Sequence, residues 1–202
     1  MPSLRSQQMP PFIVMEVLER AKALEAQGHD IIHMEVGEPD FPPPEKVKLA
    51  AIAALERGET HYTHSLGIEP LRQAIAEHYR QKYSVSVSAD QVIVTQGTSP
   101  ALLLVLCSLL DPGDEVILAN PAYACYANFI RYVGGVAVEL PVRAENGFNL
   151  DPDEVQKQIT PKTKAILINS PANPTGTLVP PETMQQLSEL GPPIISDEIY
   201  HG

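Results

Sequence analysis

The sequence Ala-Ile-Leu-Ile-Asn-Ser-Pro-Ala-Asn-Pro-Thr-Gly, residues 165–176, decides the fold. Its first part is an apolar run that predicts a strand over residues 165–169. Prolines, an asparagine and a glycine follow, and this composition is typical of a tight loop. We therefore expect a buried strand that passes directly into a rigid loop at residues 170–176.

Apolar strand patterns and helical patterns alternate along the second half of the chain. Further strands are predicted at residues 92–95, 115–119, 136–141 and 194–196. Helices are predicted at residues 100–110, 123–132 and 181–190, and another opens at residue 151. Upstream, the spacing predicts helices at residues 12–27, 42–57 and 69–83 and a short β-type run at 31–36. This alternation favours an α/β fold with a mostly parallel sheet flanked by helices on both faces.

The composition disfavours several classes of function. The chain has 202 residues, 44% of them hydrophobic, and a net charge of -11. An acidic surface repels nucleic acid and anionic membranes, so we expect neither as a partner. Cys107 and Cys125 give no disulfide framework, and we expect Cys107 to be a buried thiol within the apolar run 101–110. That run is shorter than the ~20 residues that span a bilayer. The first six residues lack the apolar segment of a secretory signal, which predicts a cytoplasmic protein.

Unusual residues gather where the predicted strands end. Open α/β sheets bind ligands beyond the carboxyl ends of their strands. Four such ends stand out, at residues 95–99, 120–123, 170–176 and 197–200. We expect them to converge on one crevice. Two of its walls would be Asn-Pro-Thr-Gly at 173–176 and Asp-Glu-Ile-Tyr at 197–200.

Each of these segments has both a functional and a purely structural interpretation. Gly-Thr-Ser at 97–99 joins a strand to a helix, so its amides and hydroxyls suit a phosphate, but a capped helix start without a ligand has the same pattern. The loop around Asn173 is either a simple turn or, if Pro174 holds it rigid, a fixed amide donor to an anionic oxygen. Asp197 is either a helix cap or a carboxylate presented where a buried strand emerges.

Taken in this order, the three segments resemble the class I/II aminotransferases of fold type I, which are pyridoxal-phosphate (PLP) enzymes. The resemblance runs over essentially the whole chain, from Gly-Glu-Pro-Asp-Phe at 37–41 through Gly-Ile-Glu-Pro-Leu-Arg at 67–72 to Tyr200. It implies the large domain of an aspartate aminotransferase-like fold. It also implies a transaminase that moves an amino group between an amino acid and a 2-oxo acid. PLP-dependent lyases and decarboxylases of the same fold, and non-catalytic regulatory modules, remain alternatives.

The resemblance assigns roles to residues around the cofactor ring. It implies that Asp197 pairs with the protonated pyridine nitrogen and keeps the ring an effective electron sink. It implies that Asn173 and Tyr200 hydrogen-bond the phenolic oxygen. Tyr123, two residues after Pro121, matches the aromatic residue that stacks on the ring face.

Further roles concern the phosphate, the substrate and a second subunit. The resemblance implies that the amide and hydroxyl groups of Gly97, Thr98 and Ser99 hold the phosphate. Tyr62 matches a tyrosine that reaches the phosphate of a neighbouring subunit, which implies a homodimer with shared active sites. Gly37 matches the backbone position that contacts the substrate carboxylate. Gln96 and Pro100 depart from the residues that many relatives carry around the phosphate loop.

The family also has parts that this sequence does not contain. The lysine that forms a Schiff base with PLP follows the Asp-x-x-Tyr motif, whereas every lysine here lies upstream of Asp197. We therefore expect that lysine beyond Gly202 and expect the chain alone to be inactive. In the family's terms, residues 1–36 are an N-terminal segment and helix of the small domain or dimer arm. Residues 37–202 are then an incomplete, truncated PLP-binding large domain.

Other polar residues carry weaker signals. His61 and His64 form a His-x-x-His pair, but metal sites need more ligands at matched spacing, so we expect no metal. Glu198 follows Asp197 directly, and adjacent strand residues point to opposite faces, so the two are not expected to act as a catalytic pair. Arg72 is expected to be a charge at a surface or an interface.

Overall fold

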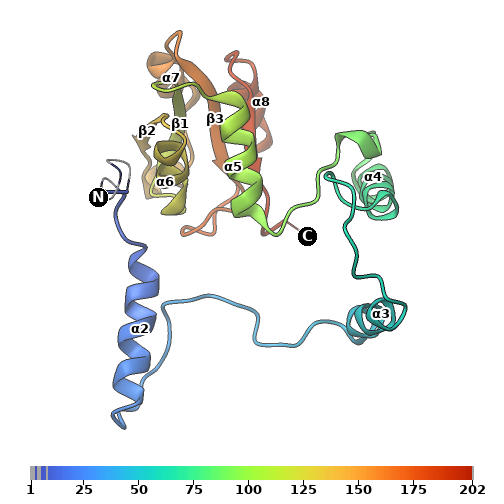
Figure 1. The fold of residues 1–202 in the computed structure, drawn as a ribbon. Helices are drawn as coiled ribbons and strands as arrows, with labels where there is room; N and C mark the ends of the chain where they lie inside the picture. The colour runs from blue at the N-terminus through green and yellow to red at the C-terminus, as the bar shows by residue number, and fades with distance from the viewer. Residues whose placement is uncertain (1–2, 4–5, 8, 202) are drawn as a thin grey trace. The chain divides into compact units, whose positions relative to one another are not determined.

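A computed structural model describes residues 3, 6–7 and 9–201 of the chain (Figure 1). The contacts divide the chain into two units. One comprises Met1–Ile13 with Gly97–Gly202, and the other comprises Val14–Gln96. Within the described residues, no helix has both the length and the apolar character needed to cross a bilayer. The separation of an N-terminal arm from a large domain at residue 36 stays a prediction.

The first unit is built on a sheet in which all neighbouring strands are parallel. The register pairs Asn169 with Asp197 at the carboxyl ends of two adjacent strands. The predicted α/β sheet is thereby confirmed, and two of the expected strand ends lie side by side. In spatial order the strands are β2 (Val136–Pro141), β1 (Glu115–Asn120), β3 (Thr163–Asn169) and β4 (Ile194–Asp197).

Helices cover both faces of this sheet (Figure 1). Successive strand residues point to opposite faces, and two separate cores result. In β1, for example, Val116 and Leu118 belong to one core and Ile117 to the other. The first core involves α5 (Thr98–Leu109) and α6 (Cys125–Tyr132), and the second involves α7 (Pro152–Gln158) and α8 (Pro181–Ser188).

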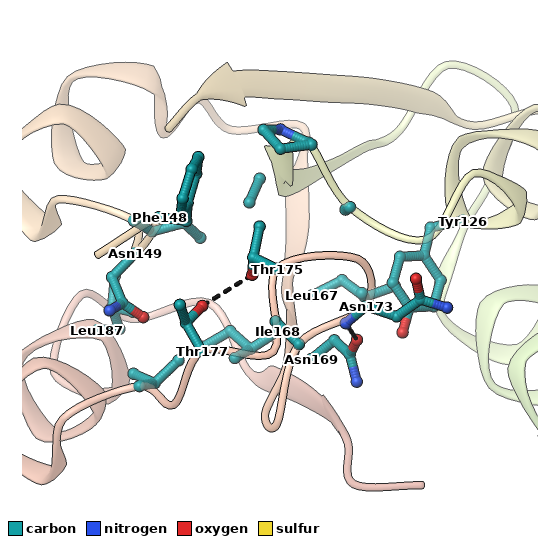
Figure 2. Close-up of a pocket in the computed structure, with 16 residues that line it drawn as sticks. Tyr126, Phe148, Asn149, Leu167, Ile168, Asn169, Asn173, Thr175, Thr177 and Leu187 are labelled. Carbon is teal, nitrogen blue, oxygen red and sulfur yellow. Dashed lines mark hydrogen bonds between the residues drawn. The ribbon is translucent and has the colours of Figure 1, made fainter. Parts of the chain in front are cut away.

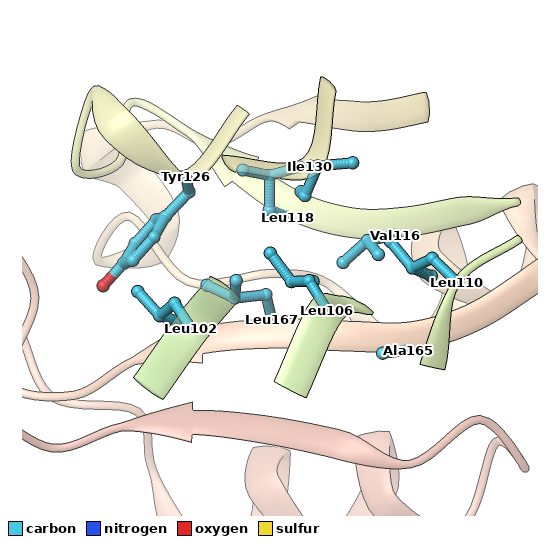
Figure 3. Close-up of a cluster of buried hydrophobic side chains, with 9 residues drawn as sticks. All are labelled: Leu102, Leu106, Leu110, Val116, Leu118, Tyr126, Ile130, Ala165 and Leu167. Atoms are coloured by element: carbon cyan, nitrogen blue, oxygen red, sulfur yellow. The ribbon is translucent and has the colours of Figure 1, made fainter. Parts of the chain in front are cut away.

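The first core extends to the carboxyl ends of the strands, because its member Tyr126 is hydrogen-bonded to Asp197 at the end of β4. Figure 3 shows Tyr126 of α6 at one end of this core, with its hydroxyl pointing out of the apolar cluster. Burial of such side chains stabilises a fold by roughly 25 cal/mol per Å² of apolar surface. The cluster therefore fixes α6 firmly against the sheet. Its buried members are Leu102, Leu106, Leu110, Val116, Leu118, Tyr126, Ile130, Ala165 and Leu167.

The helix α5 corrects one expectation. Cys107 is exposed, although the apolar run around it suggested a buried thiol. The buried stripe of this segment is formed by Leu102, Leu106 and Leu110, which are spaced four residues apart. Because successive residues of an α-helix are about 100° apart, Cys107 falls beside that stripe rather than on it.

In the second unit, α2 (Ile13–Glu25), α3 (Glu45–Glu56) and α4 (Glu69–Tyr83) agree with the predicted helices to within a few residues. Arg72 of α4 is buried instead of lying at the surface. Its Nη1 donates to the carbonyl oxygen of Ala89 over 2.9 Å and lies 3.4 Å from Asp90 Oδ1. A long side chain can bury its stem while its head finds a backbone acceptor, which is the arrangement found here.

Two predicted strands do not form. Residues 92–95 and 31–36 belong to no strand of the described sheet. The Val94 N–H donates to the Leu66 carbonyl over 3.0 Å, and a Cβ on Gly67 would lie only 2.7 Å from the Val94 side chain. The run 92–95 thus packs against a loop. A β-strand requires a partner strand as well as β-forming residues, and none of the described strands pairs with these runs.

Candidate functional site

A cavity of about 130 Å³ opens at the carboxyl ends of β3 and β4. It brings together five residues that the sequence marked as candidates: Thr98, Tyr123, Asn173, Asp197 and Tyr200. The remaining lining residues are Tyr126, Asn169 and Ile199. All of them lie in the unit that contains Gly97–Gly202.

The carboxylate of Asp197 is held through both of its oxygens. The Tyr126 hydroxyl donates to Oδ2 over 2.7 Å, and the Ile199 backbone N–H donates to Oδ1 over 3.1 Å. Tyr126 is only 1% exposed and Asp197 is half-buried, so their hydrogen bond is partly buried. Burial and the nearby Asp197 carboxylate both raise the pKa of Tyr126, which remains the proton donor of the pair. Asp197 is thus a partly buried carboxylate with a fixed orientation.

Asn169 joins the Asn-Pro-Thr-Gly loop to the end of β4. Its side-chain Oδ1 accepts a hydrogen bond from the Asn173 N–H over 2.7 Å, which Figure 2 shows, and its Nδ2 donates to the Asp197 carbonyl over 2.9 Å. The Ser170 N–H donates to the same carbonyl over 3.1 Å. The loop and the strand end therefore form one hydrogen-bonded assembly.

The Asn173 side chain meets the Tyr200 hydroxyl across the cavity. Its Nδ2 donates to that hydroxyl oxygen over 3.3 Å. Asn173 is half-buried, whereas Tyr200 is exposed. The two groups present an amide donor and a phenol at the same place. Hydrogen-bond donors clustered in this way suit an anionic oxygen.

Aromatic rings form another wall of the cavity. The ring of Tyr123 meets that of Tyr126 edge-on, with centroids 5.3 Å apart and planes at 81°. The ring of Phe12 meets Tyr123 in the same way at 6.1 Å. Burial, followed by a hydrogen bond with the Cys125 thiol, raises the pKa of Tyr123 to about 12. Tyr123 is therefore a neutral, partly buried phenol.

The amino end of α5 reaches this cavity through Thr98. Gly97 precedes it with φ 100°, a conformation that favours glycine, and a Cβ at this position would meet no atom within 4 Å. Gly97 and Ser99 are exposed and are not part of the cavity lining. Backbone N–H groups at a helix start attract anions.

The other two candidates, Gly37 and Tyr62, belong to the unit Val14–Gln96. Tyr62 is fully exposed there, and a Cβ at Gly37 would meet no atom within 4 Å. Both lie in irregular segments outside the helices. Their expected contacts with a cofactor, a substrate or a second subunit stay predictions.

Tyr126 and Asn169 were not among the residues that the sequence marked. Tyr126 lies three residues after Tyr123, a spacing that places both on one side of a helical segment. Asn169 is the last residue of β3, directly before the loop of interest. These two positions are the features of the sequence that could have marked Tyr126 and Asn169 as site residues. For Tyr126 the feature is ambiguous, because an aromatic residue on an amphipathic helix is also typical of core packing.

Figure 2 shows a second cavity beneath the Asn-Pro-Thr-Gly loop, which shares Tyr126, Asn169 and Asn173 with the first. The hydroxyls of Thr175 and Thr177 hydrogen-bond each other there over 2.8 Å. Most of the remaining lining is apolar. This cavity separates the loop from the second core, in which Leu187 is buried.

Glu198 and Lys164 do not line the cavity. Glu198 is hydrogen-bonded to the Ser196 hydroxyl over 2.9 Å and does not line the cavity. Lys164 belongs to the amino end of β3 and lies 3.8 Å from Asp114, so it is at the opposite end of the sheet from Asp197. Across residues 3, 6–7 and 9–201, no three His, Cys, Asp or Glu side chains gather as a metal site. No lysine is among the described residues that line the cavity.

Known proteins show the family to which the chain belongs. The family profile described as aminotransferase class I and II matches residues 29–202. The aspartate/prephenate aminotransferase of Thermus thermophilus is 43% identical over 98% of this chain and 52% of its own length. The arginine–pyruvate transaminase of Pseudomonas aeruginosa is 44% identical over 90% of this chain and 47% of its own length.

A solved structure gives the same result for the fold. The aspartate aminotransferase from Thermus thermophilus with maleate matches with a TM-score of 0.94 and 42% identity, over 98% of this chain and 53% of that chain. The chain therefore spans about half the length of the relatives that it matches.

Proposed function

Because the chain belongs to the class I and II aminotransferases, we propose that it is part of a PLP-dependent transaminase. The protein would move an amino group between an amino acid and a 2-oxo acid. The observation that carries this proposal is the fixed Asp197 carboxylate in a cavity that also contains Asn173, Tyr200 and Tyr123.

These residues fit the ring of PLP chemically. An oriented carboxylate suits a protonated pyridine nitrogen, and the paired donors Asn173 and Tyr200 suit a phenolic oxygen. The Tyr123 ring offers a face or an edge for stacking. When bound, PLP withdraws electrons from the α-carbon of the amino acid. The role of Asp197 is to hold the ring nitrogen protonated, and that of Asn173 and Tyr200 is to hold the ring in place.

The start of α5 fits the phosphate of PLP. The N–H groups near Gly97 and the hydroxyls of Thr98 and Ser99 are donors at the positive end of a helix. Gly97 leaves room for close approach, because a Cβ would project into space that is open in this chain. We assign these residues to the phosphate, and Thr98 links them to the cavity that contains Asp197.

Two further assignments concern residues of the unit Val14–Gln96. Gly37 would contact the substrate carboxylate through its backbone, and Tyr62 would reach the phosphate held by a second subunit of a cytoplasmic homodimer. The relatives named for aspartate/prephenate and for arginine–pyruvate are about equally similar to this chain. We therefore assign the substrates as an amino acid and a 2-oxo acid, without choosing a side chain.

We further propose that residues 1–202 alone bind PLP without a covalent bond and do not transaminate. No lysine among the described residues lines the cavity, and Lys164 lies at the other end of the sheet. Borohydride treatment of the isolated chain with PLP should give no lysine with a higher pyridoxyl content than the other exposed lysines, as read by peptide mass spectrometry. A pyridoxyl group on one specific lysine would overturn this assignment.

The test of the function compares two adjacent acidic residues in the full-length protein. Asp197→Ala should abolish transfer of the amino group and weaken PLP binding. Glu198→Gln should do neither, because Glu198 does not line the cavity. The products to be measured are the new 2-oxo acid and the new amino acid, which should form in equal amounts. A wild-type protein that binds PLP but forms no 2-oxo acid from a panel of amino acids would contradict the transaminase assignment.

A further inference from the structure

We propose that Tyr126 is a positioning residue that fixes the Asp197 carboxylate toward the ring nitrogen of PLP. This inference rests on the function proposed above and extends it to a residue on another element. Tyr126 lies on α6 and Asp197 at the end of β4, 71 residues later, and their side chains are joined by a hydrogen bond of 2.7 Å.

The surroundings of Tyr126 make this hydrogen bond rigid. Its ring is part of the buried cluster that contains Leu102 and Leu118, and the side chain is 1% exposed. Its hydroxyl points out of that cluster (Figure 3) and reaches the carboxylate. Because the ring is packed in this way, the position of its hydroxyl oxygen is fixed relative to the sheet. A hydrogen bond to a carboxylate from a buried donor is also stronger than one between neutral groups.

The carboxylate needs such a partner because its own torsion is soft. The terminal torsion of an aspartate is broad, so the side chain does not fix the plane of its two oxygens by itself. The Ile199 N–H holds Oδ1, but it lies in the exposed turn that follows β4. Tyr126 holds Oδ2 from the core of the unit. Tyr126 therefore ties the orientation of the acid to the packed sheet rather than to the turn.

Tyr126 also contacts the second residue assigned to the ring. Its N–H donates to the Tyr123 carbonyl over 3.1 Å, and the two rings meet edge-on at 5.3 Å. Tyr126 thus contacts both Tyr123 and Asp197 and sets their positions relative to each other. Only the contact with Asp197 depends on the hydroxyl, so Tyr126→Phe separates that contact from the ring packing.

The experiment measures cofactor affinity in the full-length protein by equilibrium dialysis. Two probes are used: PLP, and its 1-deaza analogue, in which the ring nitrogen is replaced by CH. Tyr126→Phe should weaken PLP binding about tenfold, because a charge-assisted hydrogen bond that orients the acid is lost. The same variant should change the affinity for the analogue by less than about twofold, because the analogue has no nitrogen for Asp197 to hold.

A variant that only disturbs the fold would weaken both probes equally, and that result would overturn the inference. Equal PLP affinity in wild-type protein and Tyr126→Phe would overturn it as well, while leaving the proposed function intact. Wild-type protein that fails to bind PLP would instead overturn the proposed function and this inference with it. In an Asp197→Ala background, Tyr126→Phe should have no further effect on PLP affinity, and a persisting tenfold loss would contradict the coupling.

Discussion

The side-chain amide of Asn173 donates a hydrogen bond to the hydroxyl of Tyr200 over 3.3 Å, although 27 residues separate them. One belongs to the loop after β3 and the other to the turn after β4. Their meeting point depends on the pairing of those two strands, in which Asn169 is opposite Asp197. The pair is therefore a direct product of the parallel register.

The first prediction concerns this pair. In the full-length protein, Asn173→Ala should weaken PLP binding about tenfold, because a donor to an anionic oxygen is removed from a partly enclosed site. Tyr200→Phe should have a smaller effect, because Tyr200 is exposed. The double variant should lose less affinity than the sum of the two single losses, since both act on one atom. Strictly additive losses would argue against a shared target.

The second prediction concerns Gly97. Gly97→Ala places a side chain at φ 100°, which should lower the free energy of unfolding by about 1–3 kcal/mol. It should also weaken the binding of PLP, because the methyl group projects in front of the helix start. Gly113→Ala is the matched control: it has φ 89° and equally open space, but it lies in the turn before the amino end of β1. It should cost similar stability in urea unfolding and leave PLP affinity unchanged.

The third prediction uses two leucines of α5. Leu106 is fully buried in the first core, and Leu106→Ala should lower the free energy of unfolding by about 2–5 kcal/mol. Leu104, two residues earlier, is 56% exposed in this chain, and Leu104→Ala should change it by less than about 0.5 kcal/mol. Urea unfolding of residues 1–202 followed by circular dichroism measures both. Equal losses would contradict the assigned inner face of the helix.

The fourth prediction concerns pH. The pKa of Tyr123 rises from 10 to about 12 in the folded protein, mainly through burial. A raised pKa means that folding favours the protonated phenol. The resulting stability is fully present below pH 10 and is lost as the pH rises toward 12. Tyr123→Phe should therefore reduce the loss of stability between pH 9 and about 11.5. The measurement is the midpoint of urea unfolding at each of the two pH values, for the wild-type protein and for the variant. An unchanged loss in this variant would contradict the prediction.

The sequence predicted the elements of the first unit well, because their signals are local. The apolar run at 165–169 is long enough to identify β3, and the Asp-Pro pair at 151–152 marks the start of α7. Asp151 accepts the hydrogen bond from the Asp153 N–H that a capping residue should accept. The edges of β1, β3 and β4 differ from the prediction by one or two residues.

The predictions that failed concern features that depend on contacts between residues far apart in the sequence. Residues 92–95 have strand-forming side chains, but strand formation depends on a partner that no local pattern reveals. Arg72 is buried because the carbonyl of Ala89, 17 residues away, accepts its hydrogen bond. Tyr126 was invisible as a site residue because its ring satisfies the pattern of a core position. Only the fold reveals that its hydroxyl ends at Asp197.

Asn169 has a consequence for how this protein can be altered. Its side-chain amide accepts a hydrogen bond from the Asn173 N–H and donates one to the Asp197 carbonyl. The segment 170–172 is therefore closed by a bond between the residue before it and the residue after it, and it is joined to the end of β4 through the same side chain. Loops generally tolerate insertions, and longer loops cost little entropy. This loop is an exception, since one added residue before Asn173 would move it out of reach of Asn169. The segment 170–172 is thus a poor place for a tag, a new terminus or a grafted peptide.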